Sequence, residues 1–103
     1  MKKSDTPSSS SGRFRIAETE SFQKQLKKNP ELKRVYRKIR EYVYPLLREN
    51  PYYGPNIKRL RENLSEYYRY RIGDYRLFYS IDDDEVIVIV VKLGHRQSAY
   101  RKK

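Results

Sequence analysis

The sequence contains no cysteine, and its only histidine is His95. The absence of cysteine excludes a disulfide scaffold, cysteine-ligated zinc, iron–sulfur clusters and thiol catalysis. A single histidine argues against a histidine-based metal site and against a Ser–His–Asp triad. We therefore expect a protein that uses neither a metal ion nor a cofactor.

Long hydrophobic runs are also missing. The longest apolar run, Val86–Val91, has six residues, whereas a membrane-spanning helix needs about 20. The chain begins MKKSDTPSSSSG, which contains no apolar secretory stretch, so we expect a cytoplasmic protein with no membrane partner. Because the serine-rich residues 1–12 have almost nothing to bury, we expect a disordered leader or the remnant of an expression tag there. Residues 13–103 are expected to form one small domain.

Positive charge is what the chain has in excess. It holds 24 Lys and Arg against 13 Asp and Glu, for a formal net charge of +11 and a pI near 9.9. Residues 21–50 carry nine bases and three acids, and residues 92–103 carry five bases and no acid. Such a surplus favours a polyanionic partner, and nucleic acid is the first expectation.

Helices are expected in the first half of the chain. Thr19 or Ser21 can cap a first helix over Phe22–Lys28. Asn29-Pro30 begins a second helix, with Asn29 as the cap and proline at the first helical position. Its apolar residues follow the i, i+3, i+4, i+7 spacing of one buried stripe; they are Leu32, Val35, Tyr36, Ile39, Val43, Leu46 and Leu47. Pro45 lacks an N–H and is expected to kink this helix.

Strands are expected elsewhere. Phe14–Ala17 alternates as a short strand, and Tyr67–Ile72 and Tyr75–Ile81 flank Gly73-Asp74, a pair suited to a type II′ hairpin turn. Val86–Leu93 is typical of a central strand covered on both faces. The order β-α-α-β-β-β predicts an α+β domain, with two N-terminal helices packed on one face of a small twisted antiparallel sheet.

The hairpin places arginines on one face. A two-residue turn sets Arg71 opposite Arg76 and Arg69 opposite Phe78. The other face is apolar and aromatic and should pack on the helices; its residues are Tyr68, Tyr70, Ile72, Tyr75, Leu77 and Tyr79. Like charges directly opposite destabilise a sheet, and a docked polyanion relieves the repulsion because guanidinium groups bind phosphate in bidentate fashion. We interpret this face as a phosphate-binding surface; the alternative for each arginine is a solvated surface charge.

The C-terminal segment adds further polar side chains. Gly94 can release the chain from the sheet, so that His95, Arg96 and Tyr100 turn over the arginine-bearing face. The alternatives are a strand-end histidine satisfied by backbone groups and a tyrosine packed against the sheet edge. Upstream, Lys58–Arg61 is read as a basic loop, with simple solvation of its charges as the alternative.

The segment Leu64–Tyr100 resembles the RelE/ParE toxins of toxin–antitoxin pairs. The matching residues are YRYRIGDYRLFY, from Tyr68 to Tyr79, and KLGHR from Lys92 to Arg96 with Tyr100. The family pattern is YR-x-R-x-GDYR, an apolar strand, and then VGHR-x-x-x-Y. The resemblance covers about residues 14–100, and it implies the same α+β fold and a cognate antitoxin protein as partner.

The resemblance implies two activities. RelE-like members enter the ribosomal A site and cleave mRNA, whereas ParE-like members inhibit DNA gyrase and are not nucleases. The tail pattern favours the RelE side, which implies a metal-independent endoribonuclease that uses 2′-OH attack on the scissile phosphate and inhibits translation. The alternatives are a gyrase inhibitor and an inactive basic RNA-binding relative.

The resemblance also implies residue roles. Arg71 and Arg76 would hold the scissile phosphate, Arg96 would stand at the leaving oxygen, and Tyr100 would stack on the base or orient it. The residues expected to contact ribosomal RNA or the mRNA backbone are Lys58, Arg59, Arg61 and Arg69.

The sequence departs from the family at the positions expected to supply the general base. RelE proteins have lysine at the positions of Arg69 and Arg71, and arginine is a poor base at neutral pH. His95 is the first candidate because histidine titrates near neutrality, and Glu66 is the second. A second departure is Glu62-Asn63, where many members carry glycine.

Overall fold

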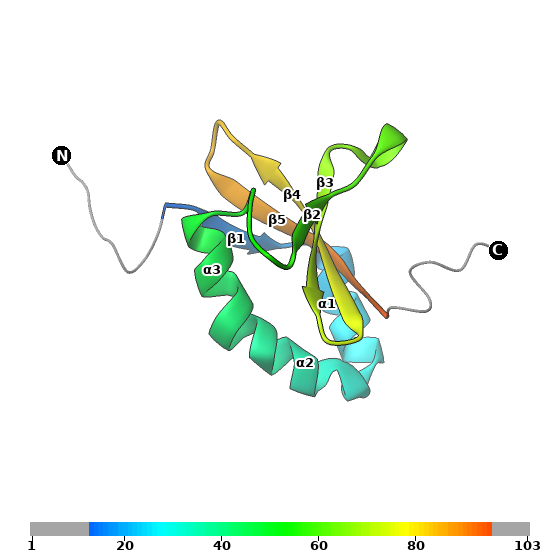
Figure 1. Ribbon diagram of the computed structural model, residues 1–103. Helices are drawn as coiled ribbons and strands as arrows, with labels where there is room; N and C mark the ends of the chain where they lie inside the picture. The colour runs from blue at the N-terminus through cyan, green and yellow to red at the C-terminus, as the bar shows by residue number, and fades with distance from the viewer. Residues whose placement is uncertain (1–12, 96–103) are drawn as a thin grey trace.

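The computed structural model of the protein describes residues 13–95 (Figure 1). The expected leader at residues 1–12 and the predicted site residues Arg96 and Tyr100 lie outside the described residues. The strands are β1 (Arg15–Glu18), β2 (Ile57–Arg59), β3 (Tyr67–Ile72), β4 (Tyr75–Asp82) and β5 (Ile87–His95). The helical segments are α1 (Glu20–Lys28), η1 (Pro30–Leu32), α2 (Lys33–Lys38), η2 (Ile39–Val43), α3 (Tyr44–Glu49) and η3 (Glu62–Leu64). The α+β class is confirmed.

The five strands form one sheet in the order β1-β5-β4-β3-β2. β1 runs parallel to β5, and the other neighbouring pairs are antiparallel. The expectation of a purely antiparallel sheet was therefore wrong. The helical segments carry the chain back across the sheet between β1 and the later strands, which is the kind of crossover that parallel pairing requires. At the short edge strand β2 the sequence predicts a loop, because three residues are too few to show an alternating pattern; the structure corrects this to a strand.

Two capping predictions have different outcomes. Thr19 caps α1, because its hydroxyl oxygen accepts a hydrogen bond from the Phe22 N–H at 3.1 Å. Asn29 makes no side-chain cap for the next segment. Instead its side-chain amide donates to the Gln25 carbonyl at 2.9 Å and closes the end of α1. The expectation of an Asn29 cap was wrong, because this bond holds the side chain toward the end of α1.

Pro45 is accommodated by a π turn. The segments η1, α2, η2 and α3 follow one another from Pro30 to Glu49, and η2 is a π-helix in which the Tyr44 N–H bonds to the Ile39 carbonyl. A π turn inserts one extra residue and rotates everything after it. As a result Tyr44 is buried at 6% exposure, whereas Leu46, expected in the buried stripe, is 53% exposed.

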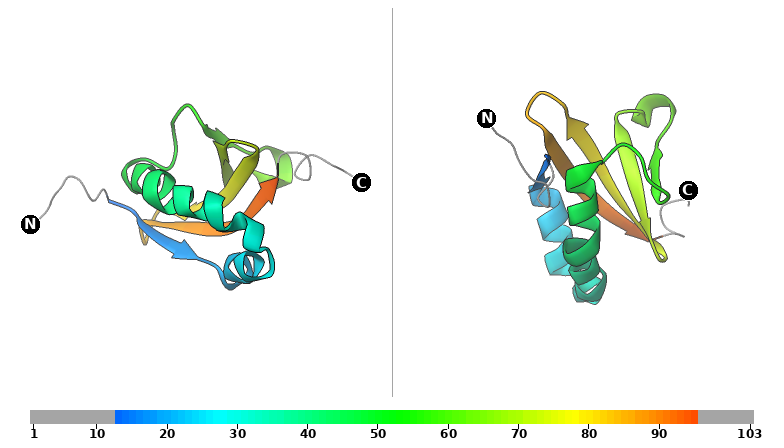
Figure 2. Two further views of the ribbon diagram at one scale, coloured as in Figure 1. Left: turned by 90° about the horizontal axis from the view of Figure 1, so that it is seen from below. Right: turned by 60° about the vertical axis from the view of Figure 1, so that its left-hand side comes forward.

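The core lies between the helices and one face of the sheet, as the right-hand view in Figure 2 shows. Tyr70, Leu77 and Tyr79 are buried there, which confirms the predicted aromatic face of the hairpin. On β5, alternate residues such as Val88 and Val90 are fully buried, but their neighbours are only half-buried. The expectation that β5 is covered on both faces was therefore wrong, and the second face of the sheet stays open. Within residues 13–95, no helix is long and apolar enough to cross a membrane.

Candidate nucleic-acid interface

The predicted register of the hairpin is confirmed. Arg71 pairs with Arg76, Arg69 with Phe78, and Ile72 with Tyr75. Gly73 has a φ of +60°, the left-handed conformation that the first central residue of a type II′ turn requires and glycine adopts without strain. The turn therefore fixes the two arginines directly opposite each other on the open face of the sheet.

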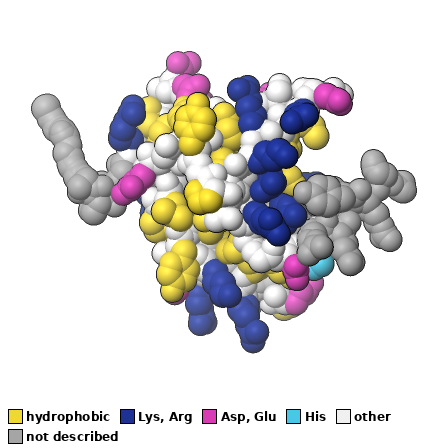
Figure 3. Space-filling model, viewed as in Figure 1, with side chains coloured by type: hydrophobic (Ala, Val, Ile, Leu, Met, Phe, Trp, Pro, Cys, Tyr) yellow, Lys and Arg dark blue, Asp and Glu magenta, His cyan; other side chains and the backbone are white. Residues whose placement is uncertain are grey.

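A row of side chains crosses four strands on this open face. Lys58 on β2 pairs with Arg69 on β3, Arg69 with Phe78 on β4, and Phe78 with Lys92 on β5. Directly paired residues share a face, so this row carries three cations and one aromatic ring. The Lys92 Nζ lies 5.7 Å from the centroid of the Phe78 ring. Figure 3 shows Lys and Arg side chains gathered over the β2–β3 side of the molecule.

The same face holds a pocket of about 440 Å³. Its lining residues are Leu60, Leu64, Tyr67, Arg69, Arg76, Phe78, Val91 and Lys92. Three cations thus meet apolar walls, and none of the described residues that line the pocket is a carboxylate. Apolar walls lower the local dielectric constant and strengthen the attraction between these cations and an anion. The pocket is therefore suited to a phosphate with an attached base.

The three predicted arginines sit at different depths. Arg76 is only 5% exposed, and its Nη1 donates to the Tyr75 carbonyl at 3.4 Å. Arg69 is half-buried and Arg71 is exposed. The Asn56 carbonyl accepts a bond from the Arg69 Nη1 at 3.3 Å and another from the Arg71 N–H at 2.9 Å. The structure thus brings Arg69 and Arg76 into one pocket, whereas Arg71 is exposed and does not line it.

The basic residues before β3 divide between the two faces. Lys58 joins the open face, but Arg59 pairs with Tyr68 and lies on the opposite one. The Arg59 Nε donates to the Ser65 carbonyl at 2.6 Å, and its guanidinium carbon lies 5.7 Å from the Tyr68 ring centroid. Arg61 is exposed in the following turn. The structure therefore brings Lys58, and not Arg59, beside the predicted arginines.

The turn after β2 contains a strained residue. Glu62 has a φ of +59°, a left-handed conformation that glycine adopts readily and other residues rarely. Glu62 belongs to the pair Glu62-Asn63, where the resemblance leads us to expect glycine in many family members. The glutamate keeps the backbone shape that a glycine would allow.

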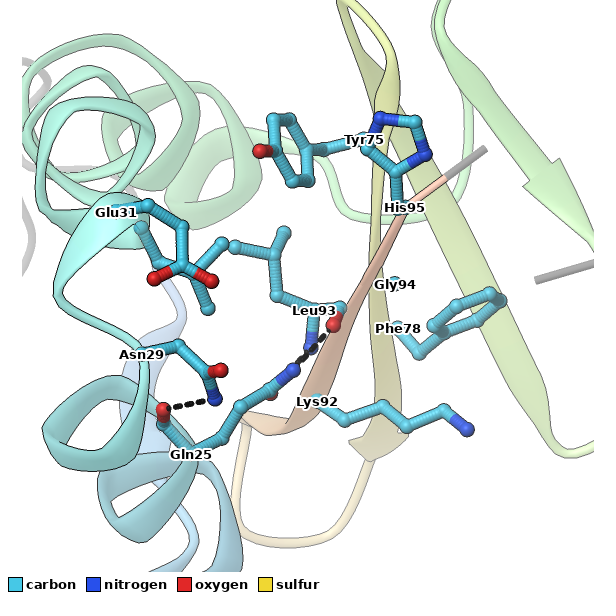
Figure 4. Close-up of a pocket in the computed structure, with 10 residues that line it drawn as sticks. Gln25, Asn29, Glu31, Tyr75, Phe78, Lys92, Leu93, Gly94 and His95 are labelled. Carbon is cyan, nitrogen blue, oxygen red and sulfur yellow. Dashed lines mark hydrogen bonds between the residues drawn. The ribbon is translucent and has the colours of Figure 1, made fainter. Parts of the chain in front are cut away.

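His95 lies on the other side of the sheet. It pairs with Tyr75, whose ring faces the helices, and the two ring centroids are 5.1 Å apart in an edge-to-face contact. His95 lines a pocket of about 630 Å³ with Gln25 and Glu31 (Figure 4). Pairing with β4 continues through Gly94 to His95, so the expected release of the chain at Gly94 does not occur among the described residues.

Glu66, the second candidate for the base, is exposed immediately before β3. Two residues of the pocket, Phe78 and Lys92, were not identified from the sequence as site residues. Lys92 carries the single charge in the otherwise apolar stretch Val86–Leu93. That isolated charge was the signal for a polar role on the open face.

The tyrosines with shifted pKa values lie outside this pocket. Burial, followed by a hydrogen bond to Glu18, raises the pKa of Tyr36 to about 12. The same two causes raise the pKa of Tyr44 well above its usual range, and burial does so for Tyr79. Within residues 13–95 no group of three or more His, Asp or Glu residues is placed to hold a metal ion.

Comparisons with known proteins place the chain in a family. Residues 16–100 match the model of the ParE toxin of the type II toxin–antitoxin system parDE. Toxin RelE of Mycobacterium tuberculosis is 31% identical over 88 residues, which cover 85% of this chain and 87% of RelE. Toxin RelG of the same organism is 40% identical over 45 residues. These residues cover 44% of this chain and 52% of RelG, so the chain matches about half the length of that relative.

A solved structure agrees with these matches. The toxin–antitoxin complex RelBE2 from Mycobacterium tuberculosis contains a chain that superposes with a TM-score of 0.67 and 28% sequence identity. The superposition covers 82% of this chain and 99% of that one. From the family match, the RelE relative and the shared fold, this chain belongs to the RelE/ParE superfamily of type II toxin–antitoxin toxins.

Proposed function

We propose that this toxin is a ribosome-dependent mRNA endonuclease that inhibits translation. The observation that carries the proposal is the pocket on the open face, where the nearly buried Arg76 meets Arg69 and Lys92 against apolar walls. Apolar walls strengthen the attraction between these cations and a phosphate. The 31% identity to a RelE toxin supports the RelE activity for this site.

The chemistry follows from the charge that develops during cleavage. The mRNA 2′-oxygen forms a bond to the adjacent phosphorus while the 5′-oxygen leaves with a proton, giving a 2′,3′-cyclic phosphate and a free 5′-OH. Negative charge grows on the phosphoryl oxygens, and fixed cations in a water-poor pocket stabilise it. Arg76 and Arg71 hold the scissile phosphate, and Arg69, Lys58 and Lys92 bind the flanking backbone.

The groups that move protons belong to the end of the chain. Arg96 donates to the leaving oxygen and Tyr100 stacks on or orients the base, roles that rest on the resemblance alone. His95 remains our first candidate for the base, and Glu66 the second. His95 follows Gly94, the residue that pairs with Arg76, and it shares a pocket with Phe78 and Lys92 of the open face.

The test uses purified protein and ribosomes programmed with a defined mRNA. We expect codon-specific cuts with the wild type and none with Arg76→Ala or Arg96→Ala. Arg15→Ala is the matched control, since Arg15 is an exposed arginine on β1, at the opposite edge of the sheet from β2. Cutting that survives both site substitutions contradicts the site assignment.

A second candidate function is inhibition of DNA gyrase without nuclease activity. The observation that favours it is the family match, whose model describes a ParE toxin. A supercoiling assay separates the two functions: inhibited gyrase and intact mRNA support the second candidate. The third possibility, an inactive basic RNA-binding relative, predicts salt-sensitive RNA binding and no growth arrest on expression.

A cognate antitoxin is the expected protein partner. A related chain was solved in the toxin–antitoxin complex RelBE2, and the cationic pocket here offers a surface for acidic or apolar segments. We expect the antitoxin to suppress the activity of the open face of the sheet with Arg69, Arg71 and Arg76, called the arginine face from here on. An antitoxin complex that still cleaves mRNA at the wild-type rate contradicts this expectation.

A further inference from the structure

A second basic surface lies on helix α2. The sequence of α2 is KRVYRK, which contains four cations and no acid, and Lys33, Arg34, Arg37 and Lys38 are all exposed. Together with the tip of the β3–β4 hairpin they line a groove of about 860 Å³. Figure 3 shows Lys and Arg side chains along the lower edge of the molecule, where Figure 1 places α2.

Folding alone does not favour this pattern. Lys33 and Arg37 are four residues apart, as are Arg34 and Lys38, and like charges at that spacing on a helix repel each other. Because all four side chains are exposed, a glutamate at one position of each pair would be tolerated and would stabilise the helix. The groove also contains Glu31 and Asp74, so two carboxylates face four cations and the surface keeps a positive balance.

The hairpin separates this groove from the arginine face. Ile72 and Tyr75 line the groove, while their neighbours Arg71 and Arg76 point to the other side of the sheet, since successive side chains alternate. Cations therefore flank the hairpin on both sides, those of α2 on the groove side and Arg71 and Arg76 on the other.

We propose that the α2–hairpin groove is a second binding surface for the phosphate backbone of RNA, separate from the arginine face. The hairpin then inserts between two RNA segments, one on each side. The lining favours RNA over a protein partner, because four of its side chains are exposed cations, whereas its apolar residues Ile72 and Tyr75 are already half-buried by the fold. The large exposed apolar residues of the described chain lie outside the groove; they are Tyr42, Leu46, Tyr53 and Leu64.

The experiment compares two variants of the full chain that lose the same charge. One carries Arg34→Gln, Arg37→Gln and Lys38→Gln in the groove. The other carries Lys24→Gln, Lys27→Gln and Lys28→Gln on α1, none of which lines the groove. Binding of a fluorescent oligouridine is measured by anisotropy over a range of salt concentrations, and melting temperatures confirm that both variants fold.

The salt dependence gives the answer. Each phosphate contact to a single strand contributes about 0.7 to the slope of log affinity against log salt, so the groove variant should lower the slope by about 2. The α1 variant should leave the slope near the wild-type value. An unchanged slope in the groove variant, or an equal fall in both variants, overturns the proposal.

A further arm tests the protein alternative. Retained RNA binding together with lost antitoxin binding in the groove variant also overturns the proposal and assigns the groove to a protein. The assay contains no ribosome and measures no cleavage. Its outcome is therefore distinguishable from success or failure of the proposed nuclease activity.

Discussion

At the scale of single residues, the arginine face carries a cost that folding alone does not explain. Arg71 and Arg76 oppose each other across β3 and β4, and opposed like charges destabilise a sheet. Arg76 is also nearly buried, and it lines one pocket with Arg69 and Lys92. A phosphate bound on this face offsets the repulsion between the paired arginines, which is why we regard the face as a site rather than as solvated charge.

The cost of the arginine pair can be measured. Arg71→Thr removes one member of the pair at an exposed position, so the free energy of unfolding should rise by about 0.2–1 kcal/mol. The control is Arg15→Thr, an exposed strand arginine that pairs with Ile87 and should gain no such stability. Urea titrations of the isolated protein provide the comparison. A loss of stability in Arg71→Thr would show that the pair does not repel.

The sequence predicted part of this site for a clear physical reason. A two-residue turn leaves only one hairpin register, so the placement of Arg69, Arg71 and Arg76 followed from counting residues. The side of His95 depended instead on whether β5 keeps pairing past Gly94, which local sequence does not determine. The isolated charge of Lys92 marks a polar position, but the sequence does not tell which face of the sheet stays open, so Lys92 could not be assigned to the site.

At the scale of elements, the π turn at Ile39–Val43 decides which side chains the long helical run buries. A continuous α-helical pattern places both Leu46 and Leu47 in the apolar stripe. The extra residue of the π turn rotates the last segment, so that Leu47 is fully buried and Leu46 is half exposed. Periodicity alone cannot predict this shift. The apolar spacing fits a continuous α-helix as well as a helix with one extra residue before Pro45, and only the structure distinguishes them.

Two neighbouring substitutions test the rotated segment. Leu47→Ala should lower the free energy of unfolding by about 2–5 kcal/mol, since it leaves a cavity in the core. Leu46→Ala should change it by no more than about 0.5 kcal/mol, as surface substitutions do. Chemical denaturation of both variants provides the measurement. Equal losses would show that the two leucines share one buried stripe and that the helix has no such shift.

A cluster around Glu18 joins β1 to the helices. The carboxylate oxygen Oε2 of Glu18 accepts hydrogen bonds from the Tyr36 hydroxyl at 2.7 Å and from the Tyr44 hydroxyl at 2.8 Å. Burial and these bonds raise the pKa of both tyrosines, that of Tyr36 to about 12. In the unfolded chain tyrosine titrates near 10, so the folded state holds these protons more tightly.

This difference predicts a loss of stability in alkali. The contribution of Tyr36 is fully present below about pH 10 and is lost as the pH rises from about 10 to about 12. The unfolding free energy of the wild type should therefore fall over this range, and that of Tyr36→Phe should fall less steeply. Tyr42→Phe, at a tyrosine that is 65% exposed, is the control. Identical pH slopes for Tyr36→Phe and the wild type would contradict the role of the cluster.

At the scale of the whole molecule, an α+β fold holds cations on both sides of one hairpin. The class of fold and the aromatic face of the hairpin could be predicted, because their patterns extend over many residues. The parallel pairing of β1 with β5 could not, since it joins segments about 70 residues apart and leaves no local signal. Much of the positive charge of the chain, +11 in total, thus lies on two surfaces, the arginine face and the α2–hairpin groove. Arg76, which is only 5% exposed, lies where we place the scissile phosphate.

The most direct test of this placement is single-turnover cleavage of mRNA on programmed ribosomes by wild type, Arg76→Met and the control Arg15→Met. We predict a rate loss of about 10²–10³-fold for Arg76→Met, the size of effect seen when one donor to a developing oxyanion is removed. The control should cut normally, and a message with a 2′-deoxy sugar at the cleaved position should stay intact. Wild-type rates for Arg76→Met, or cutting of the 2′-deoxy message, would contradict the account.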